Sequence, residues 1–378
     1  MEERQVLLVA GEASGDLHAA RLLTEMTRRS PGIRAFGLGG DELRAAGMET
    51  LWDSSEVAVV GITEVLSVLP RARRIFHGLL AAAEKRGARC AVLVDSPELN
   101  LRLARALKRR GLTVVYYVSP QVWAWRRRRI RTIRRVVDRM LVLFPFEEDF
   151  YREHGVDVVH VGHPLVDEVP RCDHVWDRPA TAAIEGRLRV ALLPGSRSSE
   201  IERLGPVFLG AGALLARRLP VDLVWIKAPG LPRDRVEALI ARSPVPVEIV
   251  ASADRLRELA RCHLAICASG TATLEVGLVG TPMIVAYRVA AWSSLVARLM
   301  VRLPHFSLVN LVSGGSVVPE LFQREASGER IAVRAEALLR DPEAIGRMRR
   351  GLAELRGRLG ERGASARAAE AVLETCGR

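Results

Sequence analysis

The sequence predicts an α/β protein with two Rossmann-like domains that face each other across a cleft, followed by C-terminal helices. Three observations favour this fold. The chain has 378 residues, which exceeds the usual size of one hydrophobic core, so two domains are expected. Short apolar runs alternate with amphipathic stretches, as in parallel sheets covered by helices on both faces. This alternation stops near residue 164 and begins again near residue 189.

The first domain, predicted at residues 1–165, contains apolar runs typical of buried strands. The stretches between them place apolar residues at helical spacing and end near glycine. Strands are expected at 5–10, 90–95, 113–118, 139–144 and 157–162, and helices at 17–29 and 99–111.

A segment rich in proline and charge interrupts this pattern at residues 164–188, and we interpret 166–188 as a linker. The second domain, predicted at 189–340, repeats the architecture. Its strands are expected at 189–195, 221–227, 245–251, 263–269 and 282–287. Residues 341–378 are predicted to be helical, and packing back on the first domain is one arrangement open to them. Because ligands of open α/β sheets bind at the carboxyl ends of the strands, the cleft is the expected site.

The net charge of +12 comes almost entirely from arginine, since Lys85, Lys108 and Lys227 are the only lysines. A positive charge favours an anionic partner. An arginine bias also follows from the base composition of coding DNA, so charge alone leaves both interpretations open.

The five cysteines do not form a metal-binding pattern. Cys90, Cys262 and Cys267 lie in apolar runs and are expected to act as small buried hydrophobic residues. Cys262, His263 and Cys267 lack a second cluster that would complete four ligands, so neither a metal nor another cofactor is predicted.

The sequence predicts neither a signal peptide nor a membrane span. The short apolar run near the N-terminus follows acidic residues, and the apolar region 264–287 is interrupted by Glu275 and Pro282. We expect a cytoplasmic protein that at most lies on a membrane surface.

Two turns that follow strands of the second domain are candidates for binding an anion. In LLPGSRSSEIERL (192–204), Gly195 permits a tight turn and Arg197 can reach an anion. Ser196, Ser198 or Ser199 can cap the next helix. A capped turn with a solvated arginine explains this stretch equally well.

The second turn lies in ICASGTATLEVGLVGTPMIVAYR (266–288), where a strand ends in Ser269, Gly270 and Thr271 and a helix begins. Helix N-termini bind phosphate, and Glu275 is placed to bind ribose hydroxyls. A capping box, the main alternative, requires Ser or Thr at position 272, which is alanine. We therefore predict a nucleotide-diphosphate site. Since the chain contains no Asp-x-Asp, a helix end and arginine would replace a metal there.

In the first domain, AGEASGDLH (10–18) and LVDSPELN (93–100) end two strands and are expected at the cleft. Asp95 and Glu98 are candidates for a general base. The alternative is that Asp95 merely begins the following helix.

Two further stretches combine arginine with bulky apolar residues. Residues 60–86 place Leu69, Ile75 and Phe76 beside Arg71, Arg73 and Arg74, which fits either a core-facing helix or an element at a membrane interface. In residues 116–135, Trp123 and Trp125 precede seven arginines that begin at Arg126. Nucleic acid, a membrane surface and a substrate that carries phosphate all fit this stretch.

Seven motifs together resemble the lipid-A-disaccharide synthases. They run in the family's order across residues 6–325: AGEASGD (10–16), DSPELN (95–100), YVSPQVWAWR (117–126), VGHPL (161–165), LLPGSR (192–197), ASGTATLE (268–275) and SLVNL (307–311). The resemblance implies an inverting glycosyltransferase of the GT-B fold. Its substrates would be UDP-2,3-diacylglucosamine and 2,3-diacylglucosamine 1-phosphate, and its products a β-1′,6-linked disaccharide and UDP.

The resemblance also implies roles for single residues. Asp95 matches the family's general base, Glu12 and Ser14 lie in its active-site loop, and Glu98 has a supporting role. Arg197, Glu275 and Asn310 match its donor-binding positions, and we add Ser269, Gly270, Thr271 and Gln323 to the predicted donor site.

Both implied substrates carry acyl chains, so the resemblance implies peripheral association with the inner face of the cytoplasmic membrane. The residues expected to contact lipid or the acceptor phosphate are Leu69, Arg71, Arg73, Arg74, Ile75, Phe76, Trp123, Trp125 and Arg126. Packing of the tryptophans inside the first domain is the alternative, and the oligomeric state stays open.

Two rival functions fit parts of the sequence. Another UDP-sugar enzyme of the same fold, a glycosyltransferase or an epimerase, shares the predicted donor site. An RNA-binding protein would need basic patches interleaved with aromatic residues. Because only residues 116–135 show such a pattern, no nucleic-acid partner is predicted.

Overall fold

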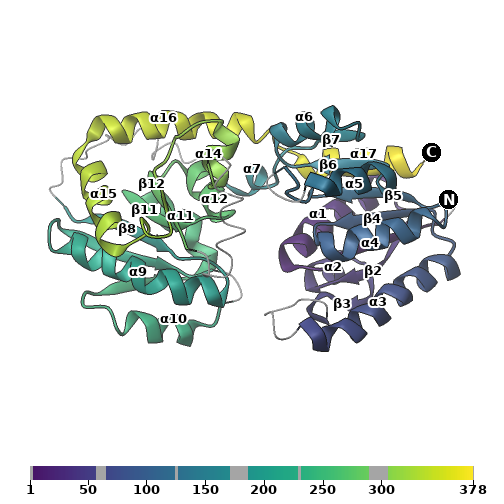
Figure 1. The fold of residues 1–378 in the computed structure, drawn as a ribbon, viewed down its shortest axis with the longest axis horizontal. Helices are drawn as coiled ribbons and strands as arrows, with labels where there is room; N and C mark the ends of the chain where they lie inside the picture. Colours follow the sequence, from purple (N-terminus) through teal and green to yellow (C-terminus); the bar gives the residue numbers. More distant parts are fainter. Residues whose placement is uncertain are drawn as a thin grey trace. The chain divides into compact units, whose positions relative to one another are not determined.

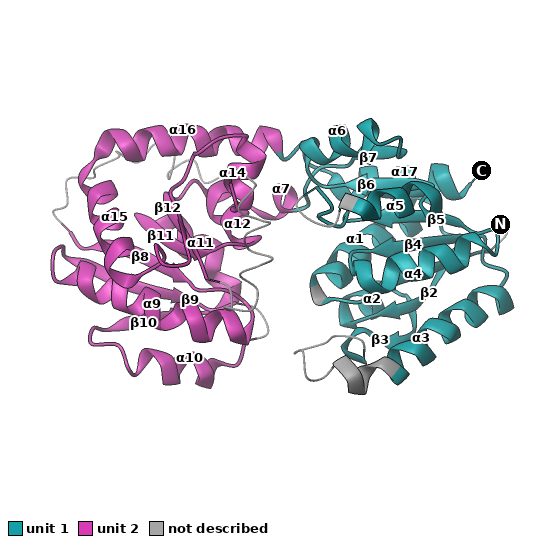
Figure 2. Cartoon of the chain, viewed as in Figure 1, with its two compact units in different colours: residues 1–164, 359–378 teal, residues 165–358 magenta. Residues whose placement is uncertain are grey.

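The computed structural model describes residues 3–56, 65–123, 127–170, 186–228, 231–288 and 305–377. The chain divides into two compact units (Figure 2). Unit 1 comprises residues 1–164 and 359–378, and unit 2 comprises residues 165–358. Each unit is built around one parallel sheet with helices packed against it (Figure 1), which confirms the predicted α/β class and the two Rossmann-like domains.

The sheet of unit 1 has seven strands in the order β3-β2-β1-β4-β5-β6-β7. They are β1 (Arg4–Ala10), β2 (Ile33–Gly39), β3 (Glu49–Asp53), β4 (Cys90–Val94), β5 (Thr113–Tyr117), β6 (Arg139–Val142) and β7 (Val158–His160). The sequence pattern predicts five of these strands and misses β2 and β3. Glycines interrupt β2, and β3 is only partly buried at the edge of the sheet, so neither forms a continuous apolar run.

Helices pack on both faces of this sheet. They are α1 (Ala13–Arg29), α2 (Asp41–Ala45), α3 (Val65–Lys85), α4 (Pro97–Lys108), α5 (Ile130–Val136), α6 (Pro145–Glu153) and α17 (Ala364–Cys376), with short 3-10 turns at Ser54–Glu56 and Arg127–Arg129. Side chains of α3, α4 and α5 share one core with alternate strand residues such as Leu93 and Tyr116. Helices α1 and α17 pack together, and α17 also contacts β5 and β6.

Unit 2 repeats this architecture with six parallel strands in the order β10-β9-β8-β11-β12-β13. The strands are β8 (Leu188–Leu193), β9 (Val221–Ile226), β10 (Val247–Val250), β11 (Leu264–Ala268), β12 (Met283–Tyr287) and β13 (Glu320–Phe322). The helices are α7 (Leu165–Glu168), α9 (Ser198–Ala216), α10 (Arg233–Ile240), α11 (Arg255–Arg261), α12 (Ala272–Val279), α14 (Leu308–Ser313), α15 (Gly328–Arg340) and α16 (Pro342–Arg358), with a 3-10 turn at Ser252–Asp254. The sequence pattern misses β13, which has only three residues.

The C-terminal helices belong to different units. Helix α16 packs on α12 and α14 of unit 2, and α17 packs within unit 1. The carbonyl of Leu359 accepts a hydrogen bond from the N–H of His163 (2.9 Å), and Arg367 donates to the carbonyl of Val161 (2.9 Å). These bonds fix the last segment to unit 1. Of the segment 166–188 that the sequence assigns to a linker, residues 171–185 lie outside the described ranges.

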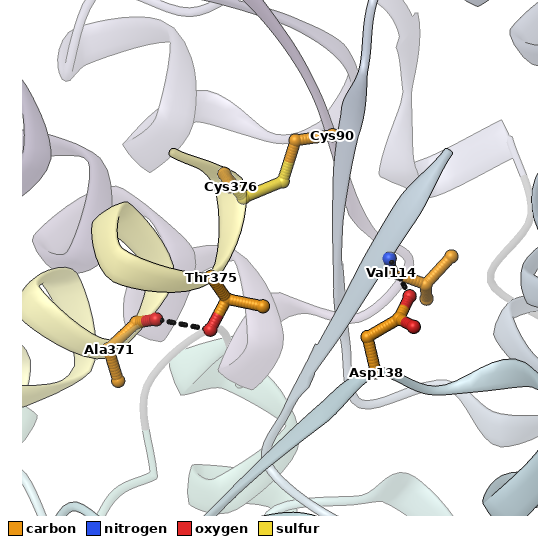
Figure 3. The surroundings of a disulfide bond; sticks show 6 residues. All are labelled: Cys90, Val114, Asp138, Ala371, Thr375 and Cys376. Carbon is orange, nitrogen blue, oxygen red and sulfur yellow. Dashed lines mark hydrogen bonds between the residues drawn. A yellow bond between two sulfur atoms is a disulfide. The ribbon is translucent and has the colours of Figure 1, made fainter. Parts of the chain in front are cut away.

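A disulfide joins Cys90 of β4 to Cys376, the last residue of α17 (Figure 3). The two Cα atoms are 5.5 Å apart, a normal separation for a disulfide, and 286 residues separate the cysteines in the sequence. Cys90 is buried as expected, but the expectation that it acts only as a small hydrophobic residue is wrong. Alternate residues of β4 point to opposite faces of the sheet, and the side chain of Cys90 is on the face that α17 covers.

We expect Cys376→Ser to lower the free energy of unfolding by about 2–5 kcal/mol, because this disulfide restricts a very long loop of the unfolded chain. Thermal unfolding with and without dithiothreitol checks the prediction. Reductant should lower the Tm of the parent protein and leave that of Cys376→Ser unchanged. The control Cys267→Ala removes a buried thiol that is in no disulfide and should keep the effect of reductant. A parent Tm that is insensitive to reductant would contradict the prediction.

Candidate functional site

Unit 2 contains a pocket of about 290 Å³ at the carboxyl ends of β8, β9 and β11, where open α/β sheets bind ligands. Five of the residues predicted to bind the donor line it: Arg197, Ser269, Gly270, Thr271 and Glu275. Two turns and the start of one helix therefore bring these residues together from distant parts of the sequence.

Gly195 shapes the turn after β8. Its φ is +125°, and a Cβ atom there would lie 2.5 Å from Oε2 of Glu200, so a larger residue would displace the turn. The Glu200 carboxylate accepts hydrogen bonds from the N–H groups of Ser196 (3.1 Å) and Arg197 (3.3 Å). The predicted serine cap is therefore wrong: Glu200 caps α9, and Arg197 occupies the N-cap position. The Arg197 side chain is 74% exposed and thus accessible to a ligand in the pocket.

The N-terminal end of α12 forms another wall of the pocket. Ser269 donates from Oγ to the carbonyl of Phe306 (3.0 Å), and Thr273 donates from Oγ1 to the carbonyl of Gly270 (2.7 Å). Thr271, the N-cap residue, makes no side-chain cap. Within the described part of the chain, the backbone N–H groups of Gly270 and Thr271 have no acceptor. Free N–H groups and the helix dipole favour a negative charge here.

The pocket contains two further cations that the sequence analysis misses, Lys227 and Arg255. Lys227 follows β9 and donates from Nζ to the carbonyl of Leu231 (2.7 Å). Arg255 binds Glu275 through two hydrogen bonds, from Nε to Oε2 (2.9 Å) and from Nη2 to Oε1 (3.1 Å). This pair orients the Glu275 carboxylate in the wall. One signal for Lys227 exists in the sequence, because a rare lysine directly follows a buried strand, whereas Arg255 lies in an ordinary charged helix.

Asn310 and Gln323 do not line this pocket, although both are predicted to bind the donor. Asn310 is fully buried: its Nδ2 donates to the carbonyl of Val318 (2.9 Å), and its Oδ1 accepts from the N–H groups of Val317 and Val318 (2.9 Å each). Its amide therefore fixes the turn after α14, and in this structure its side chain is not accessible to a ligand. Gln323 has a φ of 52°, and its N–H donates to the carbonyl of Tyr287 (2.9 Å).

In unit 1, the carboxyl ends of β1 and β4 bring the N-terminal motif beside Asp95. A Cβ atom on Gly15 of α1 would lie 3.7 Å from the Cβ of Asp95. Glu12 is the N-cap of α1, and Ser14 lies in its first turn; both are exposed. Glu12, Ser14 and Asp95 thus lie at one edge of the sheet.

Two other carboxylates of these motifs have structural partners. Asp16 is buried and accepts hydrogen bonds from the N–H groups of Gly40 (2.6 Å) and Glu42 (3.0 Å), so it caps α2. Glu98 lies in the first turn of α4 and forms an ion pair with Arg129. That pair fixes the arginine-rich segment to the helix that follows Asp95.

Trp123 is buried inside unit 1, which corrects its assignment to a membrane or acceptor surface. Its indole N–H donates to Oε1 of Glu147 (3.2 Å), and Ser119 donates from Oγ to the same oxygen (2.6 Å). The alternative interpretation, that tryptophan packs within the first domain, holds for this residue. Trp125 and Arg126 lie outside the described residues.

Burial raises the pKa of Glu147 to about 7, although the hydrogen bonds from Ser119 and Trp123 oppose this rise. A carboxyl with a raised folded-state pKa stabilises the fold below its ordinary pKa of 4.5, and this contribution is lost as the pH rises through about 7. We expect the Tm of the parent protein to fall more steeply from about pH 5 to pH 8 than that of Glu147→Gln. The loss in free energy of unfolding that is due to Glu147 is on the order of 3 kcal/mol over this range.

Thermal unfolding across this pH range measures the effect, with Glu148→Gln as the control. Glu148 is the neighbouring residue, is partly exposed and pairs with Arg152. Its variant should keep the pH slope of the parent protein. Equal slopes in the parent protein and Glu147→Gln would contradict the prediction.

Helix α3 faces the core of unit 1 at Ile75, which is 1% exposed, so the assignment of Ile75 to a membrane surface is wrong. Phe76 packs partly against the same core. Arg71 pairs with Glu56 (2.9 Å), and Arg73 and Arg74 are exposed. The side chain of Leu69 lies outside what the structure describes. At Ile75, the core-facing interpretation of this stretch is therefore correct.

Three arginines of α5 line a second hollow, of about 710 Å³, beside the C-terminal end of α6. Arg131, Arg134 and Arg135 are exposed and share one helix face. None of the three forms an ion pair within the ranges that the structure describes. Exposed guanidinium groups without carboxylate partners are suited to phosphate.

Across the described ranges, no helix is long and apolar enough to cross a bilayer. In the same ranges, no group of His, Cys, Asp and Glu side chains is arranged to hold a metal ion.

Comparison with known proteins identifies relatives along nearly the whole chain. A family model described as lipid-A-disaccharide synthetase matches residues 6–373. The lipid-A-disaccharide synthase of Myxococcus xanthus is 46% identical over 373 residues, which cover 98% of this chain and 97% of the relative. That of Syntrophus aciditrophicus is 43% identical over 378 residues, with 99% and 98% covered.

Solved structures with much lower identity share the fold. The calicheamicin glycosyltransferase CalG4 has a TM-score of 0.59 and 17% identity, covering 100% of this chain and 99% of that one. A UDP-GlcNAc 2-epimerase from Neisseria meningitidis, solved with UDP-GlcNAc bound, has a TM-score of 0.61 and 11% identity, with 99% of each chain covered. These likenesses support the GT-B fold, and since a glycosyltransferase and an epimerase share it, the fold alone does not select an activity.

Proposed function

This chain belongs to the lipid-A-disaccharide synthetase family, and we infer from this membership that it transfers 2,3-diacylglucosamine from UDP to 2,3-diacylglucosamine 1-phosphate. The products are UDP and a β-1′,6-linked disaccharide 1-phosphate, so the enzyme is an inverting glycosyltransferase. The family match over residues 6–373 carries this conclusion. A rival UDP-sugar activity is supported only by the shared fold.

We propose that the pocket of unit 2 binds the UDP portion of the donor. The free N–H groups at the start of α12, with Arg197 and Lys227, would bind the diphosphate, and Glu275 would bind the ribose. As the bond to the sugar breaks, negative charge grows on the diphosphate, and donors fixed in place stabilise it without reorganisation. This role needs no metal ion, because the helix end and the cations supply the positive charge.

We propose that Asp95 is the general base. A hydroxyl of the acceptor becomes a stronger nucleophile as it loses its proton, and a carboxylate at the strand end can accept that proton. A single displacement at the anomeric carbon then inverts its configuration. Support comes from the position of Asp95 directly after β4, beside the first turn of α1.

Mass spectrometry of the products tests the activity. The enzyme should convert UDP-2,3-diacylglucosamine and 2,3-diacylglucosamine 1-phosphate into the disaccharide 1-phosphate and UDP. With UDP-N-acetylglucosamine that carries no long acyl chains, turnover should be negligible. Efficient turnover of the unacylated sugar, with no disaccharide from the acylated pair, would favour the rival activity.

We further propose that the protein acts at the inner face of the cytoplasmic membrane, since both substrates carry acyl chains. Basic residues of unit 1 support this location. Arg73 and Arg74 are exposed on α3, and three arginines without ion-pair partners in the described ranges line the hollow on α5. Anionic headgroups attract exposed arginines.

Replacing Arg131, Arg134 and Arg135 together by alanine should weaken binding to phosphatidylglycerol vesicles by up to about 150-fold at low salt, because each of the three arginines near an anionic surface contributes about 1 kcal/mol. Vesicle co-sedimentation measures this binding. Arg330, Arg334 and Arg340 of α15 are also exposed, and their triple alanine variant removes the same charge from unit 2. If both variants lose binding equally, net charge alone would account for the effect, and the specific surface would be rejected.

A further inference from the structure

The backbone that carries Asp95 is held in a strained conformation. Asp95 has a φ of 52° and Ser96 a φ of 44°, so two consecutive residues other than glycine lie in the left-handed region. Each such residue costs of order 1–3 kcal/mol and persists only where surrounding contacts impose it. Val118, at the end of the neighbouring strand β5, has a φ of 63°, which is rare for a β-branched residue. Strain is therefore concentrated at the carboxyl ends of β4 and β5.

Two fully buried side chains fix this turn through one atom, the carbonyl oxygen of Asp95. Tyr116 donates its hydroxyl proton to that oxygen (2.5 Å), and Asn100 donates from Nδ2 to the same oxygen (2.8 Å). Asn100 also donates to the carbonyl of Val94 (3.0 Å). The two donors come from different elements, β5 and α4, so the carbonyl is held from two directions.

The position of Asn100 carries a cost in folding free energy. With Nδ2 directed at two carbonyl groups, its Oδ1 is buried and finds no donor in the described part of unit 1. A buried polar atom without a partner costs about 1–3 kcal/mol. The turn thus combines a strained backbone with an unsatisfied amide oxygen, and neither feature improves stability. Such costs are typical of a site where geometry serves function.

We propose that Tyr116 and Asn100 are positioning residues that hold the Asp95 carboxylate in its reactive orientation. This inference rests on the proposed role of Asp95 as the general base. By fixing the carbonyl of Asp95, the two donors set the rotation of the turn and hence the direction in which Cβ leaves the backbone. A small displacement of a catalytic group costs 10- to 100-fold in rate, so these remote hydrogen bonds affect turnover without touching the substrates.

Tyr116→Phe removes one hydroxyl and keeps the buried ring. We expect kcat to fall by about 10-fold, with the KM for the donor within about 2-fold and the Tm little changed. Tyr151→Phe is the matched control, since Tyr151 is also fully buried in unit 1 and donates to a backbone carbonyl, that of Pro120 (3.1 Å). Its kcat should stay within about 2-fold of the parent value.

The double variant distinguishes positioning from general support of the fold. If Tyr116 acts through the Asp95 carboxylate, adding Tyr116→Phe to Asp95→Asn should reduce kcat no further. A further 10-fold loss in that background, or an equal loss in Tyr151→Phe, would overturn the proposal. Parent-like turnover in Tyr116→Phe together with an inactive Asp95→Asn would reject positioning and keep the base. Parent-like turnover in Asp95→Asn would instead reject the base itself.

Discussion

Asp95→Asn should lower turnover by about 100-fold or more and leave the affinity for UDP nearly unchanged. Asparagine keeps the size and most hydrogen bonds of aspartate but cannot accept a proton at neutral pH. The acceptor hydroxyl would then attack without a base, which raises the barrier of the chemical step by about 3 kcal/mol or more. UDP affinity should persist because Asp95 does not line the pocket of unit 2. Steady-state kinetics and calorimetric titration with UDP measure the two quantities.

Glu98→Gln is the matched control for this prediction. Glu98 lies three residues from Asp95, but it is exposed and paired with Arg129. We expect its turnover to stay within about 3-fold of the parent value, because a partly solvated ion pair contributes little. Turnover near the parent level in Asp95→Asn would contradict the assignment of the base. Loss of equal size in both variants would show that any charge change in this turn disrupts it.

The sequence predicts most of the fold because many strands form continuous apolar runs. CAVLV in β4 and LAICA in β11 are buried at every position, as expected for parallel strands covered on both faces. The sequence pattern misses β2 (IRAFGLG) because glycines break its apolar run, and it misses β13 because that strand has only three residues. Helical spacing also shows that α3 is amphipathic without showing what its apolar face contacts. Ile75 packs in a protein core, and this depends on tertiary structure.

Local turn chemistry predicts the pocket residues that are close in sequence, such as Arg197 after Gly195 and Thr271 before α12. It cannot predict Arg255. This side chain lies in the pocket wall because it pairs with Glu275, which is 20 positions away in the sequence. Motif resemblance assigns Asn310 to the donor site, but its amide is occupied by backbone groups of Val317 and Val318. The link between Cys90 and Cys376 spans 286 residues and leaves no local pattern.

Arg197→Ala should weaken UDP binding by on the order of 1.5–3 kcal/mol, which corresponds to roughly 10- to 150-fold in Kd. Arg197 stands at the N-cap of α9, where Glu200 holds the backbone, so the guanidinium can move toward a ligand while the turn stays fixed. Its loss would remove a charge-assisted hydrogen bond to the diphosphate and leave the N–H groups of α12 in place. Arg217→Ala, at the exposed C-cap of the same helix, is the control and should bind UDP normally.

The same pocket predicts that EDTA leaves activity largely intact. In a site that relies on a metal, a carboxylate pair would hold the ion and the ion would neutralise the diphosphate. Here the carboxylates that line the pocket already have partners: Glu275 is paired with Arg255, and Glu200 binds the N–H groups of the turn after β8. An ion would have to compete with the partners that both carboxylates already have. Activity measured after EDTA treatment, alone and with added magnesium, therefore tests the source of positive charge. Loss of activity that magnesium restores would show that a metal, and not Arg197 with the helix end, stabilises the leaving diphosphate.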